Sequence, residues 1–173
     1  MRLKANGSRR SSDVLLVAPH RRYTRYYGAQ DRQFVEGILF ITSDGSNIIN
    51  YPKQHSENMT RKHQAASNLL KPTVRIFKNM RNRLIRDGKL KSGAAPSYFI
   101  EGMLHNVPPD QFGRGYQNTV DKCWGWINNA NAAELKCANG IHPLVRDNSA
   151  TSWSVQGFID FLRETQQLWL QWK

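Results

Sequence analysis

The first acidic side chain of the sequence, Asp13, stands directly before a short apolar run, Val14–Val17. A carboxylate at the start of a β-type run is a common way of presenting a metal ligand from a strand. Phosphoryl and nucleotidyl transfer through two metal ions needs two or three such carboxylates, yet the next acid along the chain is Asp31. The sequence therefore predicts one ligand of a metal site whose other ligands do not stand beside it.

The strongest candidates for phosphate binding lie in the segment 71–86 (KPTVRIFKNMRNRLIR), whose apolar residues recur at helical spacing. Lys78, with Arg75 one turn before it, is the best of them, because a lysine point charge suits triphosphate oxygens. A basic stripe of this kind is also typical of a solvated helix face, and that alternative stays open. The apolar face holds Val74, Phe77, Met80 and Leu84, and the polar face holds Lys71, Arg75, Lys78, Asn82 and Arg86.

Two further segments carry side chains that suit a bound nucleotide. Ser97 and Tyr98 offer a hydroxyl and an aromatic ring at a predicted helix N-terminus, where anions bind readily; a helix cap and a core tyrosine are the alternatives. The turn 50–55 (NYPKQH) can place the cation of Lys53 and the imidazole of His55 beside a ligand, or it can be purely structural. The other histidines are scattered, so we expect them on the surface or in the core.

The net charge of +12 is concentrated in the first half of the chain. Residues 1–92 hold 19 Lys and Arg against 6 Asp and Glu, whereas residues 93–173 hold 6 against 7. A one-sided field of this kind attracts phosphates, either of nucleoside triphosphates or of nucleic acid. A solvated basic surface is the alternative that needs no ligand.

Composition and cysteine usage exclude several classes of protein. A hydrophobic fraction of 39% is enough for a packed core, and no apolar run approaches the roughly 18 residues of a membrane helix. The N-terminal segment lacks the apolar stretch of a secretory signal. Cys123 and Cys137 belong to no CxxC pair, so we expect reduced, structural thiols. These features predict a cytoplasmic protein without a membrane partner.

The first 50 residues carry β-type patterns. The run Val14–Val17 predicts a strand near 13–18. The run 34–42 (FVEGILFIT), the turn residues Asp44-Gly45 and the run 47–51 (NIINY) together predict a hairpin of strands near 34–42 and 46–51. The basic, aromatic segment 21–28 (RRYTRYYG) before this hairpin is expected as an exposed loop or at a strand edge.

After Pro52 the pattern changes to helical periodicity, so we expect an all-helical remainder. Helices are predicted at 71–86, at 97–106, at 117–129 and at about 155–172, from apolar spacing and from the flanking prolines and glycine. The predicted fold class is α+β, with a small antiparallel or mixed sheet at the N-terminus followed by a helical C-terminal bundle. The expected domains are a partial sheet over 1–52 and a helical domain over 53–173.

The helical segments 71–86 and 96–106 (PSYFIEGMLHN) together resemble the C-terminal helical core of bacterial nucleotidyltransferases of the polymerase-β superfamily. Within it, the resemblance is to the group related to oligoadenylate synthases and to the cyclic-oligonucleotide synthases of antiphage signalling. In that group a K-P-x-V-R-x-x-K helix and an S-Y-x-x-E helix flank the nucleotide cleft. The turn 50–55 and the segment 9–16 (RRSSDVLL) are also similar to the family, so the resemblance covers about residues 5–165.

The resemblance implies a role for several residues. Asp13 would be the third ligand of catalytic Mg²⁺, Lys78 would contact the triphosphate, and Ser97 and Tyr98 would line the nucleotide pocket. The family's Gly-Ser helix start and first two carboxylates precede the matched segment, and here Gly7-Ser8 is followed by Asp13 alone. One carboxylate cannot hold two Mg²⁺ ions against water. We therefore expect an incomplete Mg²⁺ site, no turnover by this chain alone, and a complementing N-terminal segment or a homo-oligomer as partner.

Three hypotheses of function stay open at this point. The first is a nucleotidyltransferase, or its C-terminal part, which binds ATP or GTP and makes nucleotide second messengers or oligonucleotides. The second is a basic RNA- or DNA-binding module, whose binding would depend strongly on salt. The third is a catalytically dead partner or remnant.

Overall fold

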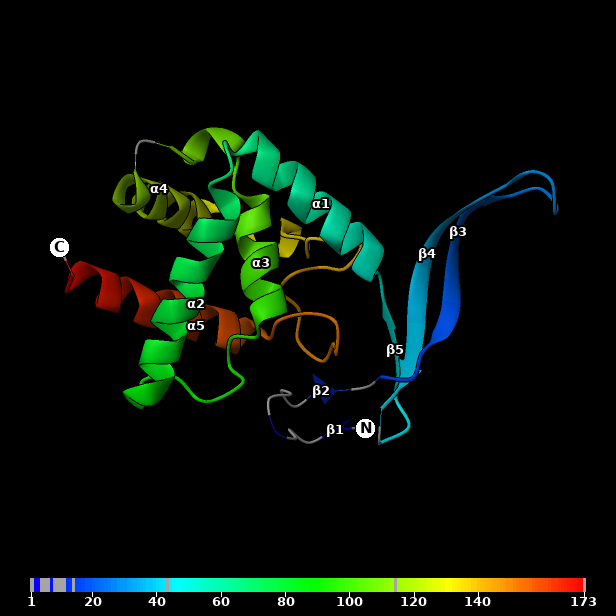
Figure 1. Ribbon diagram of the computed structural model, residues 1–173, viewed down its shortest axis with the longest axis horizontal. Helices are drawn as coiled ribbons and strands as arrows, with labels where there is room; N and C mark the ends of the chain where they lie inside the picture. Colours follow the sequence, from blue (N-terminus) through cyan, green and yellow to red (C-terminus); the bar gives the residue numbers. More distant parts are fainter. Residues whose placement is uncertain are drawn as a thin grey trace. The chain divides into compact units, whose positions relative to one another are not determined.

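The computed structural model describes residues 2–3, 7, 12–13, 15–42, 44–113 and 115–172, of which residues 2, 3, 12 and 13 are described by their backbone alone. The chain forms two compact units, Met1–Pro52 and Lys53–Lys173. The described strands lie in the first unit, and the helices fill the second (Figure 1). The α+β fold class predicted from the sequence is confirmed.

The sheet of the first unit is antiparallel, in the order β3 (Ala18–Tyr26), β4 (Arg32–Ile41) and β5 (Asn47–Asn50). A separate two-residue pair joins β1 (Arg2–Leu3) to β2 (Ser12–Asp13). The predicted β4–β5 hairpin is confirmed, and its turn uses Gly45 at a φ of 84°, where a side chain would be strained.

The N-terminal strand prediction is wrong in its position. Leu15, Leu16 and Val17 are exposed and outside any strand, and Val14 lies outside the described residues. Instead, most of the basic, aromatic segment 21–28 belongs to β3, which is an edge strand of the sheet. The reason is pairing: Tyr, Thr and Arg can form a strand with both faces exposed when a long partner such as β4 satisfies the backbone.

From Pro52 onward, the residues that the structure describes form five α-helices and two short 3₁₀ helices. They are α1 (Pro52–Ala65), α2 (Leu70–Arg86), α3 (Ser97–Asn106), η1 (Pro109–Gln111), α4 (Tyr116–Asn129), η2 (Ala132–Glu134) and α5 (Val155–Leu170). The helices predicted at 71–86, 97–106, 117–129 and 155–172 are confirmed to within two residues at each end. Among the described residues no strand follows β5, as expected.

The start of helix α1 was not predicted, because the segment 50–55 was expected to form a turn. Pro52 opens α1 instead, and Lys53 and His55 lie in its first turn. Proline suits this position because its fixed φ is helical and its missing N–H needs no partner there. The two polar side chains are therefore presented by a helix.

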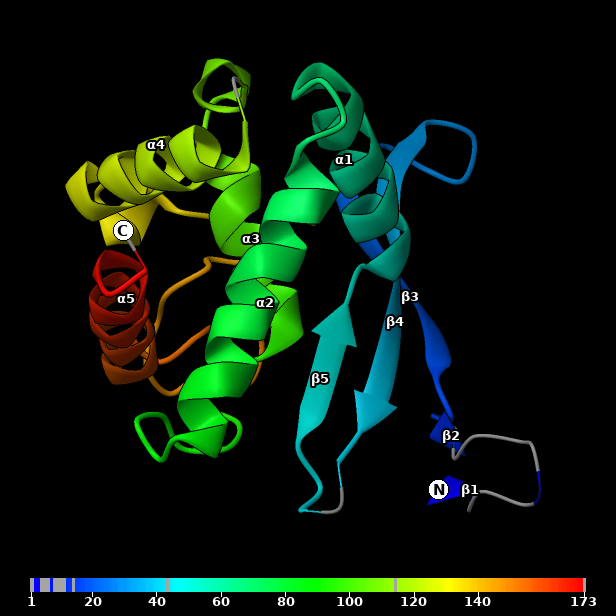
Figure 2. The ribbon, with the colours of Figure 1, turned by 60° about the vertical axis from the view of Figure 1, so that its left-hand side comes forward.

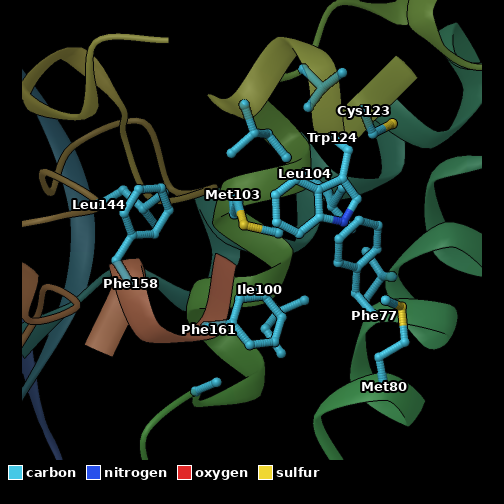
Figure 3. Packing of buried hydrophobic residues seen from close by; sticks show 14 of the residues in the cluster. Phe77, Met80, Ile100, Met103, Leu104, Cys123, Trp124, Leu144, Phe158 and Phe161 are labelled. Atoms are coloured by element: carbon cyan, nitrogen blue, oxygen red, sulfur yellow. The ribbon is translucent and has the colours of Figure 1, made fainter. Parts of the chain in front are cut away.

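The apolar faces of the helices meet in one core (Figure 3). Phe77 and Met80 of α2, Ile100 of α3 and Phe161 of α5 are fully buried. The loop after η2 packs on α3 so closely that a methyl group on Gly102 would lie 2.9 Å from Cδ1 of Leu144. The core thus fixes α2 and α3 side by side, as Figure 2 shows.

Both cysteines lie inside this core and neither forms a disulfide. Burial raises the pKa of each thiol to about 12, so Cys123 and Cys137 stay protonated at neutral pH. Among the described helices, none combines the length and the apolar character that crossing a bilayer requires.

Candidate functional site

A cavity of about 310 Å³ opens between α1, α2 and α3 of the helical unit. Its α2 wall consists of Lys71, Val74, Arg75 and Lys78, which share one face because they are three or four residues apart. The facing walls carry hydroxyl, imidazole, thioether and carboxylate groups. They come from His55, Ser56, Met59, Thr60 and Glu101. The lining is therefore basic, with three Lys or Arg side chains and one carboxylate.

That carboxylate holds two of the polar groups of the cavity. Glu101 accepts a hydrogen bond from Nζ of Lys78 at 2.6 Å through Oε1, and its Oε2 lies 2.8 Å from Nε2 of His55. The side chains of Lys78 and Glu101 are each 25% exposed and that of His55 is 14% exposed. Because an ionised carboxylate only accepts hydrogen bonds, Nε2 of His55 must carry the proton.

The environment of Glu101 keeps it ionised. Burial by itself would raise the pKa of this carboxyl, but the hydrogen bonds from His55 and Lys78 and the positive charge of Lys78 outweigh burial, so the pKa lies below its ordinary value. An ionised Glu101 in turn fixes the ammonium of Lys78 at the cavity wall. The geometry can therefore present a positioned cation, beside Arg75 and Lys71, to an anionic ligand.

An aromatic pair continues this cluster beyond the cavity. The ring of His55 stacks on Tyr98 at 4.7 Å between centroids, with an interplanar angle of 20°. The hydroxyl of Tyr98 accepts a hydrogen bond from Nδ2 of the buried Asn139 at 2.9 Å. Burial raises the pKa of this hydroxyl, so Tyr98 remains neutral. The Tyr98 side chain is thus fixed by ring stacking with His55 and by the hydrogen bond to its hydroxyl.

The structure brings some of the predicted site residues together and leaves others apart. Arg75 and Lys78 both line the cavity, whereas Ser97, Tyr98 and Lys53 are not among the described residues that line it. Ser97 opens α3, and its hydroxyl accepts a hydrogen bond from Nη1 of Arg81 at 3.1 Å. Lys53 is exposed in the first turn of α1.

The predicted metal ligand cannot be placed at the cavity. Asp13 belongs to β2, where it pairs with Arg2, but its side chain lies outside the described residues. The role that the resemblance implies for Asp13, as a ligand of catalytic Mg²⁺, therefore stays a prediction. Within the described part of the chain, no group of three or more His, Cys, Asp or Glu side chains could hold a metal ion. Those residues do not fit a two-Mg²⁺ centre, whose ions need several oxygen ligands.

Two charged residues that line the cavity, Glu101 and Lys71, were missed as site residues. The signal for Glu101 was its position three residues after Tyr98, in the S-Y-x-x-E pattern of α3. Nothing local in the sequence pairs it with Lys78, which is 23 residues away. The contact requires α2 and α3 to pack side by side, and only the tertiary structure supplies that.

Comparison with known proteins matches this helical unit to a family. Residues 57–170 match the family described as the cGAS/DncV-like nucleotidyltransferase C-terminal helical domain. The cyclic UMP-AMP synthase of Rhodothermus marinus is 34% identical over 171 residues, which cover 98% of this chain and 58% of that protein. The cyclic nucleotide synthase CdnE01 of Staphylococcus haemolyticus is 33% identical over 93% of this chain and 55% of its own length.

Two solved structures share the fold. The Rhodothermus marinus CdnE c-UMP-AMP synthase with Apcpp and Upnpp superposes with a TM-score of 0.89 at 32% identity, over 99% of this chain and 57% of that one. The Elizabethkingia meningoseptica CdnE cyclic dinucleotide synthase with GTP and Apcpp gives a TM-score of 0.79 at 30% identity, over 98% and 60%. The chain spans a little over half the length of these relatives. It belongs to the cGAS/DncV-like nucleotidyltransferases, through their C-terminal helical domain, and is a relative of the CdnE cyclic dinucleotide synthases.

Proposed function

We propose that this chain binds a nucleoside triphosphate, ATP or GTP, through the cavity between α1, α2 and α3, as part of a Mg²⁺-dependent nucleotidyltransferase. The observation that carries the proposal is the cation set on one wall of that cavity, with Lys78 held in place by Glu101. Relatives in the solved structures are bound to Apcpp, Upnpp or GTP. By family membership we further propose a cytoplasmic protein of antiviral nucleotide signalling.

The triphosphate is the part of the ligand that the cavity suits best. Three cations against one carboxylate favour a polyanion, and about 310 Å³ is at the small end for ligand pockets. An ammonium has three N–H donors. Lys78 therefore keeps two for phosphate oxygens while the third remains on Glu101. Arg75, one turn before, adds a planar donor group that suits phosphate.

The nucleoside would lie toward the N-terminus of α3. Ser97 offers its hydroxyl there, and Tyr98 offers an aromatic ring for the base. Lys53, exposed at the start of α1, would add an outer positive charge.

Turnover is a separate proposal, and it rests on Asp13. We infer that nucleotidyl transfer needs Asp13 as a metal ligand together with carboxylates beyond those of the described residues, because two Mg²⁺ ions need more oxygen ligands than one carboxylate supplies. Residues 1–173 by themselves are then expected to bind a triphosphate without converting it.

The binding proposal is tested by titration calorimetry with Apcpp and with GTP. Lys78→Ala should raise the Kd about 10- to 100-fold, because a charge-assisted phosphate contact contributes roughly 1.5–3 kcal/mol. Lys91→Ala is the matched control, since Lys91 is an exposed lysine of the same unit that lies outside the cavity. Equal effects of the two substitutions would mean that diffuse basic charge, rather than this cavity, binds the phosphates.

A further inference from the structure

The strands β3 and β4 continue as a two-stranded ribbon beyond the part of the sheet that β5 covers. β5 pairs with Ile38–Ile41 of β4 only, so Arg32–Gly37 has β3 on one side and no described strand on the other. Figures 1 and 2 show β3 and β4 running past β5 to their connecting turn. An isolated two-stranded ribbon is marginally stable in water, so the side chains on its faces decide what it can do.

One face of this ribbon carries a row of aromatic rings and a guanidinium. Tyr23 lies directly across from Phe34, with 5.6 Å between ring centroids, and Tyr26 follows Tyr23 at 5.4 Å. The guanidinium of Arg21 lies over the ring of Phe34 at 4.6 Å. A bulge between Tyr23 and Arg25 keeps the two tyrosines on the same face. We call Arg21, Tyr23, Phe34 and Tyr26 the aromatic ladder.

The ladder is open to solvent although it is rich in rings. Tyr23 is 43% exposed and Tyr26 is 61% exposed. Arg32 lies across from Tyr26 at the outer end of the ladder, and Glu36 lies across from Arg21 at the inner end. Large aromatic side chains in water are stabilised when another surface covers their faces. A partner with flat rings would fit this row.

Positive charge surrounds these rings on both faces of the ribbon. Residues 18–41 hold four arginines against two acids. On the second face Arg25 lies over the ring of Tyr27 at 5.3 Å and forms an exposed ion pair with Asp31 at 2.6 Å. An exposed pair of this kind contributes little, so an anion can exchange with the carboxylate at low cost. The partner is therefore expected to carry negative charge as well as flat rings.

We propose that the aromatic ladder binds a short stretch of single-stranded RNA or DNA. Two or three bases stack on Tyr23, Tyr26 and Phe34, and the phosphates contact Arg21 and Arg32. Flat aromatic platforms beside arginines are the common design of sequence-tolerant single-strand sites, including those on open sheets. A duplex fits worse, because its bases are already stacked on one another and its grooves expose only their edges.

This surface is independent of the triphosphate cavity. All four ladder residues belong to the unit Met1–Pro52, whereas the cavity is lined by residues of Lys53–Lys173 alone. The inference therefore goes beyond nucleotide binding, and either proposal can fail without the other.

The test is fluorescence anisotropy of the 173-residue chain with labelled 12-nucleotide oligo-U and oligo-dT. Tyr26→Ala should weaken binding about 5- to 100-fold, as expected for loss of one base–aromatic stack, and Tyr26→Phe should stay within about twofold. Tyr116→Ala is the matched control, because Tyr116 is a 55% exposed tyrosine on α4, which belongs to the other unit of the chain. With two or three phosphate contacts, the slope of log K against log salt should be about −1.4 to −2.1.

Several outcomes would overturn the proposal. They are no binding at low salt, an equal loss for Tyr26→Ala and Tyr116→Ala, or equal binding of a duplex of the same length. Loss of oligonucleotide binding in Lys78→Ala would place the strand in the helical cavity instead. If light scattering shows self-association that Tyr26→Ala abolishes while oligonucleotide binding is unchanged, the ladder is an interface between copies. Circular dichroism of each variant, and unchanged Apcpp binding by Tyr26→Ala, separate these results from misfolding.

Discussion

Glu101→Gln is the substitution that isolates the central ion pair of the cavity. The amide has nearly the shape of the carboxylate but no charge, so packing around α3 is preserved. In the wild type, the Glu101 carboxylate accepts hydrogen bonds from Nζ of Lys78 at 2.6 Å and from Nε2 of His55 at 2.8 Å. The substitution removes this anionic partner from both side chains. We expect the helical unit to be less stable at neutral pH and to keep its fold.

The magnitude follows from the exposure and number of these contacts. A charge-assisted hydrogen bond contributes roughly 1.5–3 kcal/mol when buried, and an exposed ion pair about 0–1 kcal/mol. Glu101 and Lys78 are each a quarter exposed, and the glutamine oxygen can still accept one hydrogen bond. We therefore expect a loss of about 1–2 kcal/mol, or a fall in Tm of about 2–8 °C.

The loss of stability caused by Glu101→Gln should depend on pH, and it should become smaller at low pH. The hydrogen bonds hold the folded-state pKa of Glu101 below its ordinary value of 4.5. The unfolded chain then takes up a proton in a pH range where the folded chain does not. The contribution of the carboxylate is complete above about pH 4.5 and is lost as pH falls through the lower, folded-state value. The difference between wild type and Glu101→Gln should shrink over that window.

Urea unfolding of both proteins at several pH values between 7 and 3 measures this difference. Asp87→Asn is a suitable control, because Asp87 forms exposed ion pairs with Arg83 and Arg86 at the end of α2, and solvent screening makes the loss of such pairs nearly neutral for stability. Two results would refute the reasoning. One is a Glu101→Gln protein as stable as wild type at pH 7, and the other is a deficit that is the same at pH 3.

Three further predictions concern other parts of the molecule. Burial, followed by the positive charge of Lys62, lowers the pKa of His105 to about 4, so stability should fall as pH drops from 6.5 toward 4, and His105→Gln should flatten that part of the urea-unfolding profile. Gly102→Ala should cost about 1–3 kcal/mol in urea unfolding, because its methyl group would lie 2.9 Å from a Leu144 methyl. In a radiolabelled ATP/GTP assay, residues 1–173 with Mg²⁺ should form no nucleotide product; a complementing N-terminal segment should restore synthesis, and Asp13→Asn should then abolish it.

The helices could be predicted well because their signals are local. Apolar residues at helical spacing, Pro96 before α3 and Gly88 after α2 mark faces and ends within a few residues of sequence. The same reasoning failed at the N-terminal strand, where the apolar run 14–17 suggested a strand more strongly than the basic segment 21–28 did. Strand formation depends on a partner, and the register of β3 on β4 is a long-range property that no local pattern records.

The candidate site shows the same limit. Lys78 and Arg75 could be found from charge, helical spacing and resemblance, since these are properties of α2 alone. Glu101 and His55 become partners of Lys78 only when three helices pack together. For the same reason, basic residues of one helix have different roles. Lys78 faces the cavity, whereas Arg81, three residues later, donates to Ser97 and to the carbonyl of Ala95.

The basic excess of residues 1–92 is thus divided between structures with different chemistry. On α2, cations of one helix face converge on a small cavity, where a compact polyanion gains several contacts at once. On β3 and β4, arginines alternate with exposed rings along an open ribbon, where an extended chain of phosphates and bases is the better match. A net charge of +12 could not separate these two cases. Added salt should weaken both kinds of binding, so the variants, and not the salt dependence, assign a ligand to its surface.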